Sequence, residues 1–318
     1  MHIEFVEGAG EQGRKETEEL LRGLYPRAEI RLSAGGITFA VPDGSAADLA
    51  PRLECGRFVK KVFIPMEEHC PLACSKRVFR LPFGAGRPFI IAGPCAVEDA
   101  ESYLASALAL KKAGASALRA ALFKPRSSPY SFQGIGFAGA EILAEAKKQT
   151  GLPLVSEVTD ARQIERMSEI TDVFQIGTRN MRNYELLKAV GESEMPALLK
   201  RGLNSSFREW MLSAEYLLKY GTEILILCER GDGVPEDGGK SVINFDFIRK
   251  ARELTRLPVV ADPSHSAPDR ETAARTAREA LDSGADGLLI EACQDPDRAL
   301  IDGCHTLDID SFSRLVRP

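Results

Sequence analysis

Residues 89–123 read FIIAGPCAVEDAESYLASALALKKAGASALRAALF, and this stretch contains the repeating unit on which the fold depends. It begins with an unbroken apolar run at Phe89–Gly93, continues through a helical segment at Asp99–Ala113 and reaches a second apolar run at Ala117–Phe123. Apolar runs without polar alternation are typical of parallel strands that helices cover on both faces. The stretch therefore predicts a strand–helix–strand unit whose two strands are parallel.

The same alternation continues through the rest of the chain. Strands are predicted at Phe89–Gly93, Ala117–Phe123, Pro153–Val158, Val173–Gly177, Ala197–Lys200, Glu223–Cys228, Val259–Asp262 and Gly287–Glu291. Helices are predicted at Asp99–Ala113, Ala138–Lys148, Ala161–Glu169, Tyr184–Val190, Ser206–Tyr220, Asp246–Thr255, Arg270–Ser283 and Ser311–Val316. Eight repeats in about 230 residues favour an α/β fold of the (β/α)8 TIM-barrel type. A doubly wound open sheet is the alternative, but the glycine-rich dinucleotide fingerprint is missing after the first strand.

The first 65 residues have a different pattern. Short strands are predicted at Met1–Val6, Ala28–Leu32, Gly36–Val41 and Val59–Ile64, with helices at Gln12–Leu24 and Ser45–Leu53. The order βαββαβ predicts a small α+β ferredoxin-like domain over residues 1–65. A unit of this size usually binds a small ligand or a partner surface.

Residues 66–88 are predicted to be a linker that includes a β-ribbon at Arg77–Leu81, which leaves residues 89–318 for the barrel. The linker also holds His69, Cys70 and Cys74. Three ligands fall short of the four that structural zinc usually takes, so ordinary linker thiols are favoured over a metal clip.

Composition and charge exclude several classes of protein. The chain has 318 residues, 44% of them hydrophobic, and a formal net charge of −5, which gives no electrostatic footprint for nucleic acid. No apolar run approaches the roughly 18 residues of a membrane helix, and the first residues carry no signal-peptide pattern. Seven cysteines without framework spacing indicate a reducing compartment. We therefore expect a cytoplasmic protein that binds neither nucleic acid nor membrane.

Four potential metal ligands follow different predicted strands. In a TIM barrel the chemistry takes place at the carboxyl ends of the strands. A single cysteine is usually a small buried hydrophobe, but four ligand types on one rim favour a site for a divalent transition metal such as Mn, Fe, Co or Zn. The four residues are Cys95, His265, Glu291 and Asp302.

Six cationic side chains also lie at or near the strand ends. Lone Lys and Arg residues are normally solvated surface, but six cations on one rim would repel one another unless anions lay between them. The set predicts a substrate with phosphate and carboxylate groups, and its size suggests two phosphates. The six residues are Arg119, Lys124, Arg126, Arg179, Lys200 and Arg230.

These motifs resemble those of a known family. The segment Phe123-Lys-Pro-Arg-Ser-Ser-Pro-Tyr-Ser-Phe-Gln-Gly134 resembles the signature of the 3-deoxy-D-arabino-heptulosonate 7-phosphate (DAHP) synthases, which catalyse the first step of the shikimate pathway. Related octulosonate 8-phosphate synthases read Lys-Ala-Asn-Arg-Ser where this chain reads Lys-Pro-Arg-Ser, which favours the heptulosonate enzymes. The N-terminal domain resembles the regulatory domain of one branch. Six further motifs match in order: Gly93-Pro-Cys95, Gln175–Met181, Leu198–Gly202, Ile226–Gly231, Asp262–His265 and Asp302-Gly303.

The resemblance implies a transferase that joins phosphoenolpyruvate to erythrose 4-phosphate in an aldol-type, metal-dependent condensation and releases phosphate. It implies that Cys95, His265, Glu291 and Asp302 are the metal ligands, with the metal acting on the aldehyde oxygen. For phosphoenolpyruvate, the resemblance implies that the phosphate is bound by Arg179, Lys200 and Arg230 and the carboxylate by Arg119 and Lys124. For the aldose, it implies that the phosphate is bound by Arg126 and Ser127 and that Asp262 lies near the hydroxyls. Glu157 would orient the cations or the water. Lys124 would also be the proton donor, with its pKa lowered by cationic neighbours.

Some positions depart from the family pattern. Ala120 and Ala121 replace two glycines, and their methyl groups are expected to narrow the pocket. The segment 232–245 differs from the family, so the alternative is a paralogue that takes another phosphorylated aldose, such as an octulosonate 8-phosphate synthase-like enzyme. A non-catalytic barrel is disfavoured because every presumed ligand and cation is retained.

The resemblance also bears on regulation and assembly. Some tyrosine-sensing members carry His-x-Ser where this chain has Arg31-Leu32-Ser33, so an aromatic amino acid is a candidate inhibitor at the N-terminal domain. Barrels of this family commonly form tetramers, and we expect a homo-oligomer.

Overall fold

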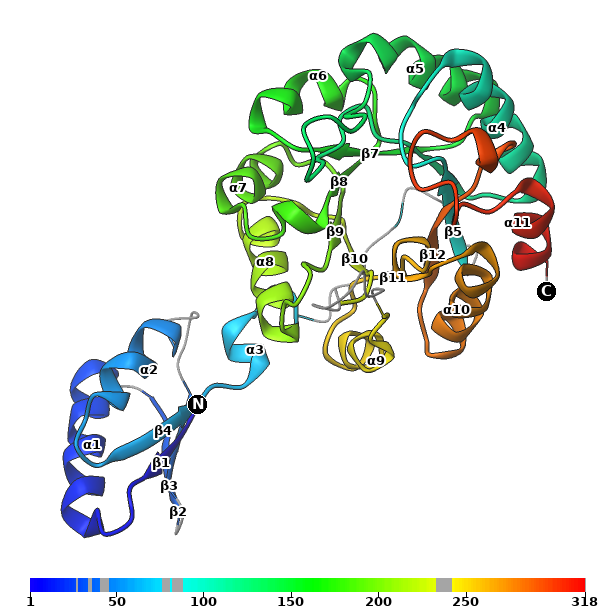
Figure 1. The fold of residues 1–318 in the computed structure, drawn as a ribbon. Helices are drawn as coiled ribbons and strands as arrows, with labels where there is room; N and C mark the ends of the chain where they lie inside the picture. The colour runs from blue at the N-terminus through cyan, green and yellow to red at the C-terminus, as the bar shows by residue number, and fades with distance from the viewer. Residues whose placement is uncertain are drawn as a thin grey trace. The chain divides into compact units, whose positions relative to one another are not determined.

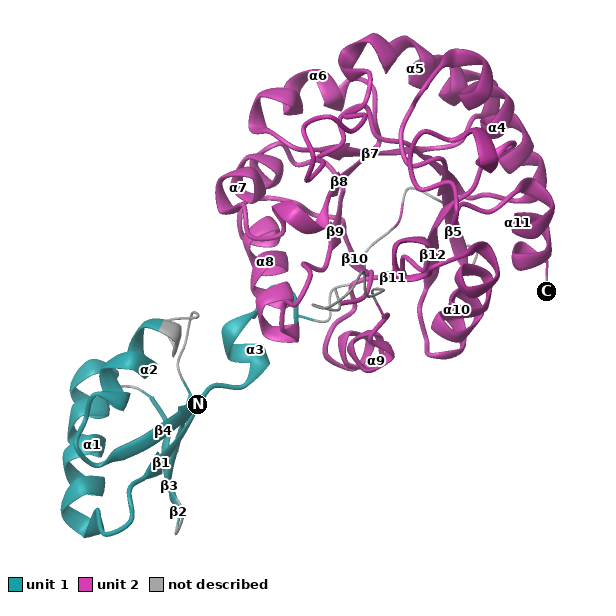
Figure 2. Cartoon of the chain, in the orientation of Figure 1, with its two compact units in different colours: residues 1–75 teal, residues 76–318 magenta. Residues whose placement is uncertain are grey.

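The computed structural model describes residues 1–26, 28–33, 36–40, 46–75, 81, 88–232 and 242–317. Contacts between residues divide the chain into two compact units, Met1–Ser75 and Lys76–Pro318 (Figure 2). In the part of the chain that is described, no helix is long and apolar enough to cross a membrane.

The first unit is a four-stranded antiparallel sheet with two longer helices. Its elements are β1 (His2–Phe5), α1 (Gly10–Leu24), β2 (Ile30–Ser33), β3 (Gly36–Phe39), α2 (Ala46–Glu54), β4 (Val59–Phe63) and the short α3 (Met66–His69). The sheet order is β2-β3-β1-β4. Helix α1 buries Gly13, Thr17 and Leu21, which recur every four residues and form one face of the helix. The apolar core of this unit includes Ile3, Ile37 and Leu53.

The second unit is a closed barrel of eight parallel strands, surrounded by helices (Figure 1). The strands are β5 (Phe89–Gly93), β6 (Ala117–Arg119), β7 (Leu154–Val158), β8 (Val173–Ile176), β9 (Ala197–Lys200), β10 (Leu225–Glu229), β11 (Val259–Ala261) and β12 (Gly287–Glu291). The helices are α4 (Ala100–Ala113), α5 (Ala140–Thr150), α6 (Ile164–Ser168), α7 (Tyr184–Glu192), α8 (Phe207–Lys219), α9 (Phe245–Leu254), α10 (Arg270–Asp282) and α11 (Ile309–Val316). The predicted TIM barrel is confirmed.

The barrel interior is filled by apolar side chains from all eight strands. Every strand residue is buried, which explains why the strands appear in the sequence as continuous apolar runs. The interior cluster consists of Phe89, Ile91, Ala117, Val155, Val173, Leu198, Ile226, Cys228, Val260 and Leu289. The interior is therefore a packed core, and only the rim is left for polar chemistry.

One strand is shorter than predicted. Strand β6 ends at Arg119, whereas the apolar run predicted it to continue to Phe123. The backbone N–H of Lys124 donates to the carbonyl oxygen of Gln133 at 2.8 Å, so the chain has already entered a loop that closes on itself. Beyond Arg119 the regular strand has ended: the pairing continues as an isolated parallel bridge between Ala96 and Ala121, and Phe123 packs edge-on against Phe137.

The predicted domain boundaries at residues 65 and 88 remain predictions. The structure groups α3 and the residues up to Ser75 with the first unit. Of the predicted β-ribbon at Arg77–Leu81, residues 77–80 lie outside the described residues, as do residues 233–241 of the unusual segment after β10.

Candidate active site

Four potential metal ligands from four separate loops and strands come together at the rim of the barrel. Cys95, His265, Glu291 and Asp302 each offer one ligand atom, and these atoms all lie within 4.8 Å of one another. Cys95 Sγ lies 3.3 Å from Asp302 Oδ2, and His265 Nε2 lies 3.3 Å from Glu291 Oε1. The geometry thus brings together the whole group of ligands predicted from the sequence.

Local backbone structure explains how two of these side chains reach the rim. Cys95 follows Gly93, whose φ is +159° and where an added Cβ would lie 1.9 Å from the carbonyl oxygen of Arg119. Only glycine lets β5 and β6 approach so closely just before the thiol. Asp302 has a φ of 58°, a left-handed conformation that is uncommon for residues other than glycine and that is often found at functional sites.

The other two ligands are set by the ends of β11 and β12. Glu291 is the last residue of β12, and its backbone N–H donates to Ser264 Oγ at 2.9 Å. His265 lies in the 3-10 turn Ser264–Ser266 that follows β11. This hydrogen bond ties the two neighbouring strand ends together.

The electrostatics of the cluster suit a bound cation. Burial raises the pKa of the Cys95 thiol, and the nearby Glu291 carboxylate raises it further. Burial alone would also raise the pKa of Glu291, but the charges of His265 and Arg119 and the His305 ring hold it well below the usual range. Glu291 Oε2 is buried without a hydrogen-bond partner among the described residues. A thiol, an imidazole and two carboxylates form a donor set that fits a divalent transition metal.

Asp262 connects the metal cluster to the cationic side chains. It is fully buried, and its Oδ2 lies 2.5 Å from Lys200 Nζ and 2.8 Å from His265 Nδ1. A carboxylate on one ring nitrogen fixes the ring orientation and leaves Nε2 free for a metal. Although Asp262 was predicted to lie near the aldose hydroxyls, it is not among the residues lining the cavity described next.

A cavity of about 460 Å³ opens beside the cluster. Five of the six predicted cations line it, together with two of the four candidate ligands. Its lining consists of Lys124, Pro125, Arg126, Ser127, Ser128, Ser131, Glu157, Gln175, Gly177, Thr178, Arg179, Lys200, Leu203, Arg230, His265, Asp302 and His305. Five cations against two carboxylates make this cavity suitable for a ligand with several negative charges.

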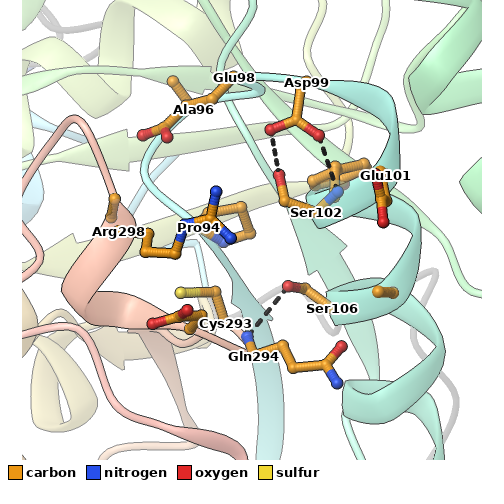
Figure 3. Close-up of a pocket in the computed structure, with 14 residues that line it drawn as sticks. Pro94, Ala96, Glu98, Asp99, Glu101, Ser102, Ser106, Cys293, Gln294 and Arg298 are labelled. Carbon is orange, nitrogen blue, oxygen red and sulfur yellow. Dashed lines mark hydrogen bonds between the residues drawn. The ribbon is translucent and has the colours of Figure 1, made fainter.

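A second cavity, of about 510 Å³, has the opposite charge character (Figure 3). Its walls carry Glu98, Asp99, Glu101 and Asp295 against the single cation Arg298. Asp99 caps α4 by accepting from the Ser102 backbone N–H at 2.8 Å, and Ser106 Oγ accepts from the Gln294 backbone N–H at 3.0 Å. A polyanionic substrate would be repelled here, so the cationic cavity is the candidate active site.

The sixth predicted cation, Arg119, has a different environment. Its side chain is 2% exposed, and its Nη1 donates to Glu291 Oε1 at 2.8 Å and to the Pro94 carbonyl oxygen at 3.0 Å. Arg119 is not among the cavity-lining residues. In the structure it contacts the candidate ligand Glu291, and the contact with a substrate carboxylate that the resemblance implies stays a prediction.

Lys124 also differs from expectation in one respect. Its Nζ lies 3.4 Å from Glu157 Oε2, which also accepts from Gln175 Nε2 at 3.3 Å. Burial works to lower the pKa of Lys124, but Cys95 and Glu157 outweigh it, so the pKa is raised. The predicted lowering is wrong because the acidic groups raise the pKa of Lys124 by more than burial and the neighbouring cation Arg119 lower it.

The two alanines that replace family glycines do not line the cavity. Ala120 and Ala121 are each 1% exposed, and Ala121 packs with Cys95 and Ile301. The expected narrowing of the pocket by their methyl groups is therefore wrong, because these methyl groups fill space under the cysteine loop.

Several cavity-lining side chains were not singled out from the sequence, and two of them, Gln175 and His305, contact candidate functional residues. Gln175 lines the cavity and binds Glu157, and a polar residue in an otherwise apolar strand was the available signal. His305 also lines the cavity, and its Nε2 lies 3.5 Å from Glu291 Oε2. Its position three residues after Asp302 was the signal that could have found it.

Comparison with known proteins identifies the family. The sequence profile described as "DAHP synthetase I family" matches residues 72–317. The chain is 36% identical over 275 residues to a phospho-2-dehydro-3-deoxyheptonate aldolase of Thermotoga maritima, covering 85% of this chain and 81% of that protein. It is 31% identical over 260 residues to a 2-dehydro-3-deoxyphosphooctonate aldolase of Syntrophotalea carbinolica, covering 76% and 93%.

A solved structure gives the same assignment. The crystal structure of a Thermotoga maritima phospho-2-dehydro-3-deoxyheptonate aldolase (DAHP synthase) superposes with a TM-score of 0.82 at 30% identity and covers 99% of this chain and 94% of that chain. Because the family profile spans the whole barrel and the heptonate relative is similar over most of both chains, this protein belongs to the DAHP synthetase I family.

Proposed function

We propose that this protein condenses phosphoenolpyruvate with erythrose 4-phosphate to give 3-deoxy-D-arabino-heptulosonate 7-phosphate and inorganic phosphate. The observation that carries the proposal is a cavity with five cationic side chains that opens beside four convergent metal ligands, in a barrel of this family. Each substrate carries a phosphate, and phosphoenolpyruvate adds a carboxylate, so the charge of the cavity matches the pair. The enzyme is thus a transferase that forms a carbon–carbon bond.

Cys95, His265, Glu291 and Asp302 would hold one divalent ion, either Mn, Fe, Co or Zn. A thiolate ligand favours these ions over Mg²⁺ and Ca²⁺, which prefer oxygen. When bound, the ion supplies Lewis-acid polarisation of the aldehyde oxygen. Arg119 holds Glu291, and Asp262 holds His265, so both ligands are oriented by buried partners.

The phosphoenolpyruvate phosphate is assigned to Arg179, Lys200 and Arg230, and its carboxylate to Lys124. Arg230 Nη2 donates to the His265 carbonyl oxygen at 3.3 Å, and Lys200 is fixed by Asp262, so two of these cations are already oriented. Preorganised cations lose little side-chain entropy when the phosphate binds. Arg119 supports this end of the site indirectly, through its hydrogen bonds to Glu291 Oε1 and to the Pro94 carbonyl oxygen.

The aldose phosphate is assigned to Arg126 and Ser127, which lie on the loop after β6 and line the cavity. C3 of phosphoenolpyruvate forms the new bond to the aldehyde carbon, and Lys124 Nζ–H donates a proton to the aldehyde oxygen. Water then adds at C2, and one of its protons replaces the proton that Lys124 gave. The bond between C2 and the phosphate oxygen then breaks, and the proton of the new C2 hydroxyl passes to the leaving phosphate. This releases inorganic phosphate and leaves a ketone at C2, while Glu157 orients Lys124.

The N-terminal sheet is proposed to be a ferredoxin-like regulatory unit that binds an aromatic amino acid, and the chain to form a homo-tetramer. The order β1-α1-β2-β3-α2-β4 and the antiparallel sheet support the ferredoxin-like assignment. Tyrosine or phenylalanine at millimolar concentration should inhibit turnover of the full chain. Unchanged rates with both amino acids would contradict the regulatory role.

Substrate choice is tested by measuring phosphate release from phosphoenolpyruvate with a panel of phosphorylated aldoses of four and five carbons. We expect the highest kcat/KM with erythrose 4-phosphate. The variant Arg126→Ala should raise KM for the aldose with little change in KM for phosphoenolpyruvate, since its charge serves one substrate. Preference for a five-carbon aldose phosphate would contradict the proposal and favour the octulosonate activity named for several relatives.

A further inference from the structure

His305 is brought to the metal cluster by a tight turn. The backbone N–H groups of His305 and Thr306 both donate to the Asp302 carbonyl oxygen, at 3.3 and 3.2 Å, and Thr306 Oγ1 donates to the same oxygen at 2.9 Å. The next residue, Leu307, donates its N–H to the Glu291 carbonyl oxygen at 2.9 Å. The turn therefore fixes His305 between two of the candidate metal ligands.

The turn brings His305 Nε2 opposite Glu291 Oε2, and both atoms are buried. His305 Nε2 lies 3.5 Å from Glu291 Oε2, and neither atom has a hydrogen-bond partner among the residues that the structure describes. The separation exceeds the 2.7–3.2 Å typical of an N–H···O hydrogen bond. An unpaired buried donor or acceptor costs about 1–3 kcal/mol, so a small approach that joins the pair is favourable.

The geometry separates the roles of the two Glu291 oxygens. Oε1 lies toward the cluster, 3.3 Å from His265 Nε2, and also accepts from Arg119 Nη1 at 2.8 Å, whereas Oε2 lies toward His305. Because a carboxylate oxygen has two lone pairs, Oε1 can accept this hydrogen bond and still bind the ion. His305 does not belong to the group of four whose ligand atoms lie within 4.8 Å of one another. This argues against His305 as a direct ligand and in favour of a role that acts through Glu291.

The second ring nitrogen supports the same assignment. His305 Nδ1 lies 3.6 Å from the Cys304 thiol, which can donate its proton to a neutral ring nitrogen. With Nδ1 as acceptor, Nε2 carries the ring proton and points it at Glu291 Oε2. This arrangement of the thiol and the ring fits the tautomer that can donate to the carboxylate.

We propose that His305 is a positioning residue of the metal site, whose Nε2–H binds Glu291 Oε2 and leaves Oε1 for the ion. The inference rests on the proposed metal site. Carboxylate ligands are commonly oriented by such outer hydrogen bonds, and their removal typically weakens metal binding about 10–100-fold.

The test measures Mn²⁺ binding to the metal-free full-length chain by competition with a chromophoric chelator. His305→Leu should weaken binding about 10–100-fold. His305→Gln, which keeps an N–H donor, should recover most of the affinity. His2→Leu makes the same substitution at a surface histidine of the first unit, bonded there to Thr38, and should leave the affinity unchanged. Thermal unfolding of each metal-free variant checks that the fold is retained, and His305→Asn replaces the leucine variant if that one unfolds.

The visible spectrum of the Co²⁺-loaded protein distinguishes a positioning role from direct ligation. His305→Leu should keep the thiolate–Co²⁺ absorption band that Cys95→Ser removes, and the coordination number should not change. Affinity unchanged in His305→Leu would overturn the inference, as would a changed coordination number or a change confined to the KM of a substrate. If the unaltered protein bound neither Mn²⁺ nor Co²⁺, the proposed metal site itself would fail, and that result is distinct from the others.

Discussion

Asp262 holds two of the candidate functional side chains at once, because its carboxylate contacts both Lys200 and His265 in a fully buried position. Replacing it with Asn leaves Lys200 as a buried and uncompensated cation. Breaking a buried ion pair in this way costs about 3–5 kcal/mol of unfolding free energy. Since His265 also loses its orienting partner, we expect Asp262→Asn to lower kcat/KM about 10–100-fold.

Urea unfolding and steady-state kinetics check this expectation. Asp246→Asn is the matched control, since it makes the same change in an exposed pair with Arg249, and such a pair contributes about 0–1 kcal/mol. Wild-type stability and turnover in Asp262→Asn would contradict the role given to this carboxylate.

Gly177 leaves room for the side chain of Glu157. A Cβ added at Gly177 would lie 2.0 Å from Glu157 Oε1, so Gly177→Ala must push away the carboxylate that contacts Lys124. We expect kcat to fall about tenfold or more, the order of effect seen when groups that orient a reacting side chain move by an ångström. Gly177 lies outside the left-handed region, so backbone strain does not add to the effect.

The control for this variant is Gly23→Ala. Gly23 lies in α1 with nothing within 4 Å of an added Cβ, and alanine there should raise the unfolding free energy by about 0.5–1 kcal/mol without changing kcat. Unchanged kcat in Gly177→Ala would show that Glu157 does not orient Lys124.

At the scale of elements, the final helix depends on the residue that precedes it. Asp308 caps α11 by accepting from the Ser311 backbone N–H at 2.7 Å, and α11 packs against α4. We expect Asp308→Ala to lower the unfolding free energy by about 1 kcal/mol, and Asp308→Asn to retain most of the cap.

The same cap predicts a direction with pH. The Ser311 N–H holds the pKa of Asp308 below its usual value, so the carboxylate stabilises the fold above the unfolded-state pKa of about 3.9. This contribution is lost as the pH falls through the lower pKa of the folded state. The difference in unfolding free energy between the wild type and Asp308→Ala, measured with urea, should be full at pH 7 and shrink below pH 4. A difference that grew toward low pH would contradict this account.

Buried strands appear in the sequence as apolar runs, so the limits of a strand can be predicted where the run and the strand end together. The limits of β5, β9 and β12 agree with the sequence prediction because each is an apolar run that ends at a polar or turn-forming residue. The apolar run of β6 continued past the end of the strand, because Ala121 packs with Cys95 and Ile301 and Phe123 packs against Phe137. Hydrophobicity alone cannot distinguish these two uses of an apolar residue.

The sequence predicted which residues belong to the candidate site but not which of them contact one another. The rule that barrel chemistry gathers at the carboxyl ends of strands collected all four candidate metal ligands and five cavity cations. It could not show that Arg119 would bind Glu291 or that Asp262 would bind Lys200, because barrel closure brings together residues 172 and 62 positions apart. These contacts decide which side chains face a substrate and which support another side chain.

At the scale of the whole molecule, charge is distributed unevenly. The chain carries a net charge of −5, yet the cavity beside the metal ligands is lined by five cations, whereas the neighbouring cavity is lined by acids. Net charge therefore says nothing of a local anion site. The anion site was predicted from the positions of the cations relative to the strand ends.

The central claim is that one metal-dependent site joins the two phosphorylated substrates. The most direct test is phosphate release from phosphoenolpyruvate and erythrose 4-phosphate by the full chain, before and after EDTA treatment and after Mn²⁺ is added back. We predict turnover that EDTA abolishes and Mn²⁺ restores, with no restoration in Cys95→Ser. Turnover that survives complete removal of metal would contradict the metal site, and no turnover of erythrose 4-phosphate under any metal would contradict the proposed reaction.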